Sequence, residues 1–383
     1  MGFRVPAPRS YILLTTGAKE VLVAWRVTWS RTEDGGDDAA AGDRNDAGAW
    51  ELRTSLVASH GHLKKRDHKE WKKGCGSVAA STATDHRFMA VAGFVPVQNS
   101  SGSSEDGGGA GSPPCCLLAL AGTSGGSVTA MALANGSGHQ GGGGGWRQAA
   151  ALRYHTRPVL SLSVAAIPLS SEASNAGSGG AVAVVACSGA TDGTIAMWDL
   201  TALSAAHAGA SALTSAPLDL APVAILTQSH QSGVNCSALT RAPGGVPGRL
   251  LLASGGDDQT LRVALLSVAR AGITDASAAE VATAAVTVLA TAAVDYAHSS
   301  AIKGVWMNEE GVVATTGMDQ RLRVWSARVE GADSNDGVEV KVTPVAGSFV
   351  ECPEPEELDA WTDANGLTSI AVSGRGVQMF NLE

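Results

Sequence analysis

Histidine, serine or threonine, and aspartate recur together three times in this sequence, and these are the residue types of a hydrolase triad. The hydroxyl residue and the aspartate keep a constant spacing, and each histidine is followed four residues later by Val or Ile. In each set the aspartate lies four residues after a serine or threonine. Six residues after the aspartate is a position that holds Trp in two of the three sets. The three sets are His155, Ser188, Asp192 and Trp198; His230, Ser254 and Asp258; and His298, Thr315, Asp319 and Trp325. Because a catalytic triad occurs once per active site, the threefold repetition favours a structural role over a catalytic one.

We expect each set to form a hydrogen-bonded structural tetrad. The aspartate of a tight turn accepts a hydrogen bond from the upstream histidine, which in turn reaches the hydroxyl and the Trp indole. The second set has Ala264 at the Trp position, so its repeat is expected to be locally weaker. Replacing Asp192 by Ala should break a tetrad and destabilise the fold by roughly 1–3 kcal/mol.

Other candidate catalytic and metal-binding motifs lack their context. Residues 122–126 match the G-x-S-x-G string of a nucleophile elbow, which needs a strand–turn–helix setting, whereas 127–133 is typical of a strand. The six cysteines form no C-x-x-C pair and are expected to be reduced core thiols of a cytosolic or nuclear protein. The acidic pairs at 257–258 and 356–357 are expected to be solvated in turns. The sequence therefore predicts no enzyme, no metal site, no cofactor and no small-molecule substrate.

A basic segment at 60–73 is the strongest local charge feature. It holds six basic residues against two acidic ones, a local charge of +4 in a chain of net charge −9. The basic residues are Lys64, Lys65, Arg66, Lys69, Lys72 and Lys73. With three histidines and Trp71 in the same segment, the composition suits phosphate neutralisation and base stacking. One hypothesis is RNA contact, and the alternative is a solvated insert or a nuclear-localisation-like run.

Composition indicates a folded chain with many low-complexity inserts. Of the 383 residues, 44% are hydrophobic and 16% are charged, which excludes a charge-rich disordered protein. Stretches rich in Gly, Ser and Ala are expected to be disordered loops, and no apolar run reaches the roughly 18 residues of a membrane helix. We expect three regions along the chain. They are the first, partial unit of a repeated β-sheet fold (a partial blade) at 1–30, a disordered insert at 31–49, and further blades with the basic insert at 50–383.

Short apolar runs between the inserts predict an all-β fold. Each run has five to seven residues bounded by Gly, Asp or Pro, which is typical of strands; examples are 159–164, 181–187, 194–198, 250–254 and 260–265. Two Ala-rich pieces, 201–213 and 275–293, are weaker candidates for short helices. Without the inserts, most of the repeats approach the roughly 40–45 residues of a WD-repeat blade. The sequence therefore predicts a WD-repeat β-propeller of about five full blades plus a partial one, in an open or incompletely closed ring.

Several segments resemble one family of WD-repeat proteins in particular. This family comprises the non-catalytic partners of the 2′-O-methyltransferase that modifies the wobble nucleotide of tRNA anticodon loops. The resemblance is carried by residues 187–201, 229–235, 318–322, 353–361 and 373–381, and by the placement of the basic insert at 60–73. It covers about 10–30, 56–94 and 115–383, and it fits the C-terminal portion of the longer family members.

The resemblance implies a cytoplasmic scaffold for tRNA processing that holds the methyltransferase subunit and tRNA. Catalysis and the methyl donor S-adenosylmethionine would then belong to the partner. The alternative is a generic WD-repeat interaction scaffold for signalling or ubiquitin-ligase assembly, with no role in RNA.

Overall fold

The computed structural model describes most of the strand-forming parts of the chain. The described residues are 10–17, 20–31, 50–60, 87–96, 117–133, 145–169, 181–208, 217–270, 284–331, 337–363 and 366–382. The basic residues at 64–73 and the insert at 32–49 lie outside these ranges.

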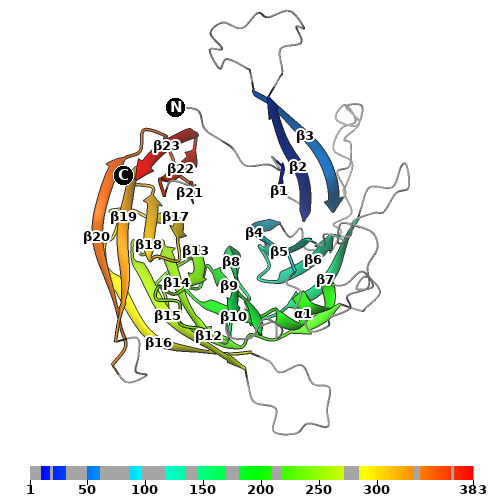
Figure 1. Cartoon of the computed structure of the whole chain (residues 1–383), viewed down its shortest axis with the longest axis horizontal. Coiled ribbons are helices and arrows are strands. Elements are labelled where there is room, and N and C mark those ends of the chain that lie inside the picture. The colour runs from blue at the N-terminus through cyan, green and yellow to red at the C-terminus, as the bar shows by residue number, and fades with distance from the viewer. Residues whose placement is uncertain are drawn as a thin grey trace, which may run out of the picture.

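Six sheets, almost entirely antiparallel, make up the fold, and Figure 1 shows them arranged as successive blades around a ring. Blade 1 contains β1 (Ser10–Gly17), β2 (Val21–Arg31) and β3 (Trp50–His60). Blade 2 contains β4 (Phe88–Phe94), β5 (Leu117–Thr123), β6 (Val128–Leu133) and β7 (Trp146–Leu152), with β11 (Leu218–Leu220) added in parallel to β7. Blade 3 contains β8 (Val159–Pro168), β9 (Val182–Ala190), β10 (Ile195–Asp199) and β12 (Ala224–Leu226).

The second half of the ring continues in the same way. Blade 4 contains β13 (Val234–Arg241), β14 (Arg249–Gly256), β15 (Leu261–Arg270) and β16 (Ala284–Val294). Blade 5 contains β17 (Ile302–Met307), β18 (Val312–Gly317), β19 (Arg321–Glu330) and β20 (Glu339–Phe349). Blade 6 contains β21 (Glu357–Thr362), β22 (Thr368–Gly374) and β23 (Gly376–Leu382). One short helix, α1 (Thr201–His207), follows β10.

The core lies between neighbouring blades. Strand β9 is buried along nearly its whole length because both of its faces are covered, which explains its continuous apolar sequence. One cluster joins blades 2 and 3 around Leu152 and Trp198, and another joins blades 4 and 5 around Leu251 and Trp325. The hydrophobic effect therefore favours the stacking of blades as much as the folding of each one.

The ring is interrupted between its first and last blades. Strand β8 contacts β13, β13 contacts β17, and β17 contacts β21, whereas β1 packs against β4 on its other side. In Figure 1 the blue β1–β3 and the red β21–β23 stand apart, and no comparable strand contact joins them among the described residues.

The all-β propeller fold is confirmed. The apolar runs at 159–164, 250–254 and 260–265 lie in or beside β8, β14 and β15. The total of six blades agrees with the expected five full blades plus a partial one. The difference is that two blades, the first and the last, have three strands each. Blade 1 extends to residue 60 rather than 30, because β3 pairs with β2 along eleven residues across the intervening insert. Of the two Ala-rich candidates for helices, α1 is a helix and 284–294 is strand β16.

Candidate functional site

Blade 5 brings together a complete His–Thr–Asp–Trp set. Nε1–H of Trp325 on β19 donates a hydrogen bond to Oγ1 of Thr315 on β18 at 3.0 Å. The same Oγ1 lies 2.8 Å from Nε2 of His298, and Nδ1 of His298 lies 2.9 Å from Oδ1 of Asp319. The histidine side chain is fully buried and that of the aspartate is 6% exposed.

Burial sets the direction of the hydrogen bonds in this network. Burial lowers the pKa of His298 more than Asp319 raises it, so the imidazole is neutral. Burial acts to raise the pKa of Asp319, but hydrogen bonds from His298 and from the backbone N–H of Ser299 outweigh it and the pKa is lowered. The neutral imidazole therefore donates Nδ1–H to the carboxylate, and its Nε2 accepts the hydroxyl proton of Thr315. The lone pairs of that hydroxyl remain free to accept the indole N–H of Trp325.

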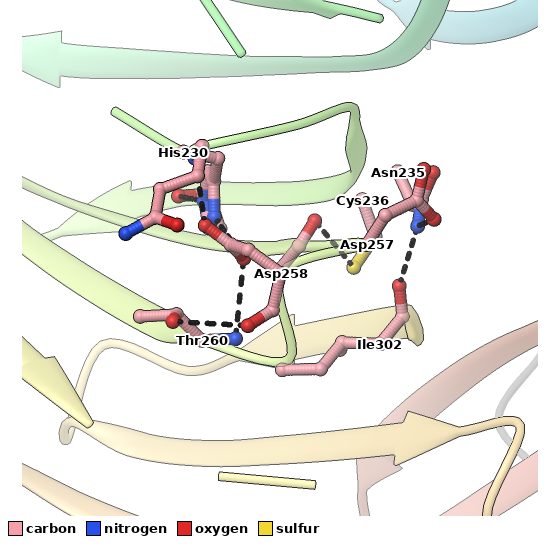
Figure 2. Close-up of polar contacts among 10 residues, drawn as sticks. His230, Asn235, Cys236, Asp257, Asp258, Thr260 and Ile302 are labelled. Carbon is pink, nitrogen blue, oxygen red and sulfur yellow. Dashed lines mark hydrogen bonds and ion pairs between the residues drawn. The ribbon is translucent and has the colours of Figure 1, made fainter. Parts of the chain in front are cut away.

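Blade 4 keeps the same network without the indole. Nδ1 of His230 lies 2.9 Å from Oδ1 of Asp258, and its Nε2 lies 2.9 Å from Oγ of Ser254. Figure 2 shows the Asp258 carboxylate between His230 and the backbone N–H of Thr260. Burial lowers the pKa of His230 as in blade 5, so the same proton arrangement holds. Ala264 stands where Trp325 stands in blade 5.

Blade 3 departs from the expected tetrad at its aspartate. Nε2 of His155 lies 2.8 Å from Oγ of Ser188, and Nε1–H of Trp198 donates to that oxygen at 2.9 Å. Asp192 is exposed and its Oδ1 accepts the backbone N–H of Thr194 instead. Nδ1 of His155 is buried without a hydrogen-bond partner. The structure thus brings together three of the four side chains, and Asp192 acts on His155 through its charge alone.

The residue after each aspartate lies in the left-handed backbone region. It is Gly193 (φ 77°) in blade 3, Gln259 (φ 67°) in blade 4 and Gln320 (φ 56°) in blade 5. Glycine adopts this region without the steric cost that a Cβ atom imposes. At Gly193 a Cβ atom would also lie 2.2 Å from the backbone oxygen of His230, so the tight turn requires glycine there.

One polar pair was missed by the sequence reasoning. Nε1–H of Trp25 donates to Oγ1 of Thr15 at 3.0 Å, ten residues earlier, as Trp198 does to Ser188. The spacing of ten between hydroxyl and Trp was the signal that would have found it. Because Ser188 and Trp198 lie on the second and third strands of blade 3, the same pairing assigns β1 and β2 to the second and third strand positions of blade 1. Among the described residues, blade 1 therefore has no strand at the first position.

A cavity of about 280 Å³ lies at the centre of the ring, lined by residues from the innermost strands of all six blades. At its wall Nδ2–H of Asn235 donates to Oδ1 of Asp257 at 2.6 Å and to the backbone oxygen of Ile302 at 3.1 Å (Figure 2). Nζ of Lys303 lies 4.0 Å from the same carboxylate oxygen. Asp257 is exposed to solvent, as expected, and is also held by Asn235 of its own blade and by Lys303 of blade 5.

Glu357 also lines the central cavity, at the first position of β21. Partial burial raises the pKa of this carboxyl to about 7. A hydrogen bond from the backbone N–H of Leu358 acts to lower this pKa, and the negative charges of Asp359 and Glu356 act to raise it further. Sequence reasoning assigned residues 356–357 to a solvated turn. A lone glutamate at a strand start gives no signal that it faces the channel.

The described cysteines are free, buried thiols, namely Cys187, Cys236 and Cys352. Burial raises the pKa of Cys187 to about 11 and that of Cys236 still further, so neither is a reactive thiolate. No group of three or more potential metal ligands occurs within the described ranges. Nor does this part of the chain contain a helix long and apolar enough to cross a membrane.

The nucleophile-elbow string has the wrong context. Ser124 follows β5 in a tight turn that leads directly into strand β6, and its Oγ accepts the backbone N–H of Arg87 at 3.0 Å. The six basic residues proposed for RNA contact lie outside the described ranges, so the structure gives no geometry for them.

Comparisons with known proteins identify distant relatives. No family model matches the chain. It is 26% identical over 204 residues to the tRNA (34-2'-O)-methyltransferase regulator WDR6 of Rattus norvegicus, covering 52% of this chain and 17% of that protein. The human protein of the same name is 25% identical over 204 residues, covering 51% and 17%, and the Bos taurus protein is 28% identical over 142 residues, covering 36% and 12%.

The chain therefore spans about a sixth of the length of these relatives. Among solved structures, the match to Saccharomyces cerevisiae Sqt1 covers 97% of this chain and 84% of the Sqt1 chain, with 10% sequence identity and a TM-score of 0.44. That structural likeness is too distant to support a functional argument. The chain is a WD-repeat propeller with distant sequence similarity to WDR6.

Proposed function

We propose that this chain is a non-catalytic WD-repeat scaffold for 2′-O-ribose methylation of the wobble nucleotide of tRNA, binding both the methyltransferase and tRNA. The observation that carries the proposal is the similarity to regulators of a tRNA (34-2'-O)-methyltransferase across half of the chain. The described polar networks support a structural rather than a catalytic use of His, Ser and Asp. Such a subunit would work in the cytoplasm, and imaging of a tagged chain tests that location.

The stacked blades suit a platform that holds two partners in fixed relation. The tetrads of blades 4 and 5 fix the turns between strands, and the inter-blade clusters fix the blades against one another. Turns at the ends of strands are the parts of such a ring that face outward and are free to contact partners. The partner enzyme would supply the catalytic residues and the methyl donor.

The charge distribution supports the basic segment as the proposed RNA contact. Residues 60–73 carry +4, so the remaining residues carry −13, the difference between −9 and +4. An acidic remainder repels phosphate, and tRNA must therefore be held by a local basic patch or by the partner.

The test is co-purification from cells that lack the endogenous regulator. We expect the tagged chain to bring down a methyltransferase and tRNA, and to raise wobble 2′-O-methylation measured by mass spectrometry of tRNA nucleosides. Recovery of other protein complexes with neither tRNA nor a methyltransferase would contradict the proposal. That result would favour the generic interaction scaffold instead.

The RNA contact has its own test by charge removal. Changing the six basic residues to Gln should lower tRNA affinity and flatten the slope of log K against log salt by roughly 0.7–0.9 per lost phosphate contact. The thermal midpoint should stay nearly unchanged, because side chains that bind phosphate must be accessible to RNA, and accessible charges contribute little to stability. The residues changed are Lys64, Lys65, Arg66, Lys69, Lys72 and Lys73.

A matched pair of triple variants separates a specific patch from general charge. One replaces Lys64, Lys65 and Arg66 by Gln, and the other replaces the exposed residues Arg270, Arg328 and Lys341 by Gln. We expect the first to weaken tRNA binding more than the second. Equal losses, or an unchanged affinity and salt slope in the six-residue variant, would rule out this segment as the RNA contact.

A further inference from the structure

Blade 4 has an open cavity at the position where its neighbours hold a tryptophan. The cavity has a volume of about 310 Å³ and lies between blades 3 and 4. Ala264 and Ser254 of blade 4 line it, and Ile195 and Leu226 of blade 3 face them across the interface. Its size is at the lower end of the range of small-molecule sites.

Internal comparison shows what occupies the corresponding space elsewhere in the ring. Trp198 packs between blades 2 and 3, and Trp325 packs between blades 4 and 5, each at the position equivalent to Ala264. In both cases the indole N–H donates to the Ser or Thr hydroxyl ten residues earlier. The fold is therefore built to hold an indole ring at this position, and blade 4 lacks the side chain that would supply it.

Ser254 has an unused acceptor aimed at this indole position. His230 donates Nδ1–H to Asp258, so its Nε2 accepts the hydroxyl proton of Ser254. The oxygen of Ser254, a residue that is 2% exposed, then keeps lone pairs for an incoming N–H. In blade 5 the equivalent oxygen receives the Trp325 indole.

The cavity adds a second feature that suits an aromatic guest. Arg262 lines it, and the Nε of Arg262 is buried without a hydrogen-bond partner. A guanidinium beside an aromatic ring gains cation–π stabilisation, especially where water is excluded. The remaining walls are mixed: apolar side chains such as Leu252 and Val288 line one part, and Thr227, Gln228, Ser229 and Thr291 line the rest. Val288 is 44% exposed at the outer edge, which leaves a way in from solvent.

We propose that this cavity binds the indole group of a ligand, with the ring between blades 3 and 4 and its N–H donated to Oγ of Ser254. The indole belongs either to a free small molecule or to a tryptophan side chain of a polypeptide. This inference is independent of the proposed role in tRNA modification.

The test is a titration of the purified full chain with indole, followed by calorimetry and by the thermal midpoint. We expect saturable binding with a Kd of about 0.1–1 mM, reasonable for so small a ligand, and a rise in midpoint. Benzofuran has nearly the same shape without the N–H donor and should bind about tenfold more weakly, the worth of one hydrogen bond. N-acetyl-tryptophan amide distinguishes the sources: binding as tight as that of indole points to a polypeptide side chain, and binding of indole alone points to a small molecule.

Two variants locate the site. Ala264→Trp should fill the cavity, raise the thermal midpoint and abolish indole binding, whereas Val377→Trp adds an indole at an exposed position of blade 6 and should change neither. Indole binding that persists in Ala264→Trp would overturn the proposal, as would the absence of saturable binding up to 5 mM. Equal affinities for indole and benzofuran would likewise overturn it, because Ser254 would then contribute nothing.

Discussion

The aspartates of the three repeats should differ sharply in their contribution to stability, although their sequence positions are equivalent. Oδ1 of Asp319 receives Nδ1–H of His298 at 2.9 Å and the backbone N–H of Arg321 at 3.2 Å, and Oδ2 receives the backbone N–H of Ser299 at 3.0 Å. Within the described part of the chain, Asp192 receives a single hydrogen bond, from the backbone N–H of Thr194 at 3.0 Å.

The magnitudes follow from these contacts. Hydrogen bonds to a charged group contribute about 1.5–3 kcal/mol, and an unpaired buried donor costs a further 1–3 kcal/mol. Asp319→Ala removes these three bonds and a fourth, from the hydroxyl of Ser299 to Oδ2 at 3.3 Å, and leaves Nδ1–H of the fully buried His298 unpaired, although water reaches the exposed groups. We expect a loss of about 3–4 kcal/mol in the free energy of unfolding. Asp192→Ala removes one exposed hydrogen bond and should cost under about 1 kcal/mol. This replaces the roughly 1–3 kcal/mol expected from the sequence, because Asp192 does not bind His155.

The assay is urea unfolding followed by circular dichroism, with hydrogen exchange measured by mass spectrometry for each blade. Asp319→Ala should speed exchange in β18 and β19 while leaving blade 3 unchanged. Asp192→Ala serves as the matched control in the same fold. A loss for Asp192→Ala equal to that for Asp319→Ala would refute the reasoning, because it would mean that Asp192 does engage its histidine.

Three further predictions concern the turns, the central cavity and acid stability. Gln259→Gly should raise the free energy of unfolding by about 0.5–1 kcal/mol by relieving a left-handed backbone, and Gly193→Ala should lower it, both measured by urea unfolding. Glu357→Gln should stabilise the chain at pH 8 but not at pH 4, because the raised pKa means that the folded state disfavours the ionised carboxylate, which is present at pH 8 and absent at pH 4; equal effects at both pH values would contradict this. Stability should fall on acidification below about pH 6.5, by up to about 1.4 kcal/mol per pH unit for each buried histidine, because the unfolded state takes up protons that the folded state excludes. Thermal midpoints between pH 7 and 5.5 check it, and a midpoint that stays constant over that range would count against neutral histidines.

The sequence predicts the fold because the same local solution is repeated. The constant offsets among Thr315, Asp319 and Trp325, shared with Ser188, Asp192 and Trp198 and in part with the third set, reflect one geometry of turn and strands. Apolar runs bounded by turn residues were also sufficient to place the strands of blades 3 to 5.

Features that depend on contacts between distant segments were not predictable. Strand β3 joins blade 1 across an insert, and nothing in residues 50–60 names β2 as its partner. Asp192 accepts the backbone N–H of Thr194 instead of binding His155, although its spacing from Ser188 matches that of the other two sets. The perturbed pKa of Glu357 likewise results from the meeting of six blades at one channel.

The interruption between blades 1 and 6 has a consequence for how the molecule comes apart. A closed ring gives every blade two neighbours, whereas this one behaves as a short linear array whose terminal units are each supported from one side. In such nearest-neighbour arrays, local opening begins at the ends, where each unit has one neighbour, and moves inward. Fraying should therefore start in blades 1 and 6, while blades 3 and 4, with neighbours on both sides, exchange their amide protons last.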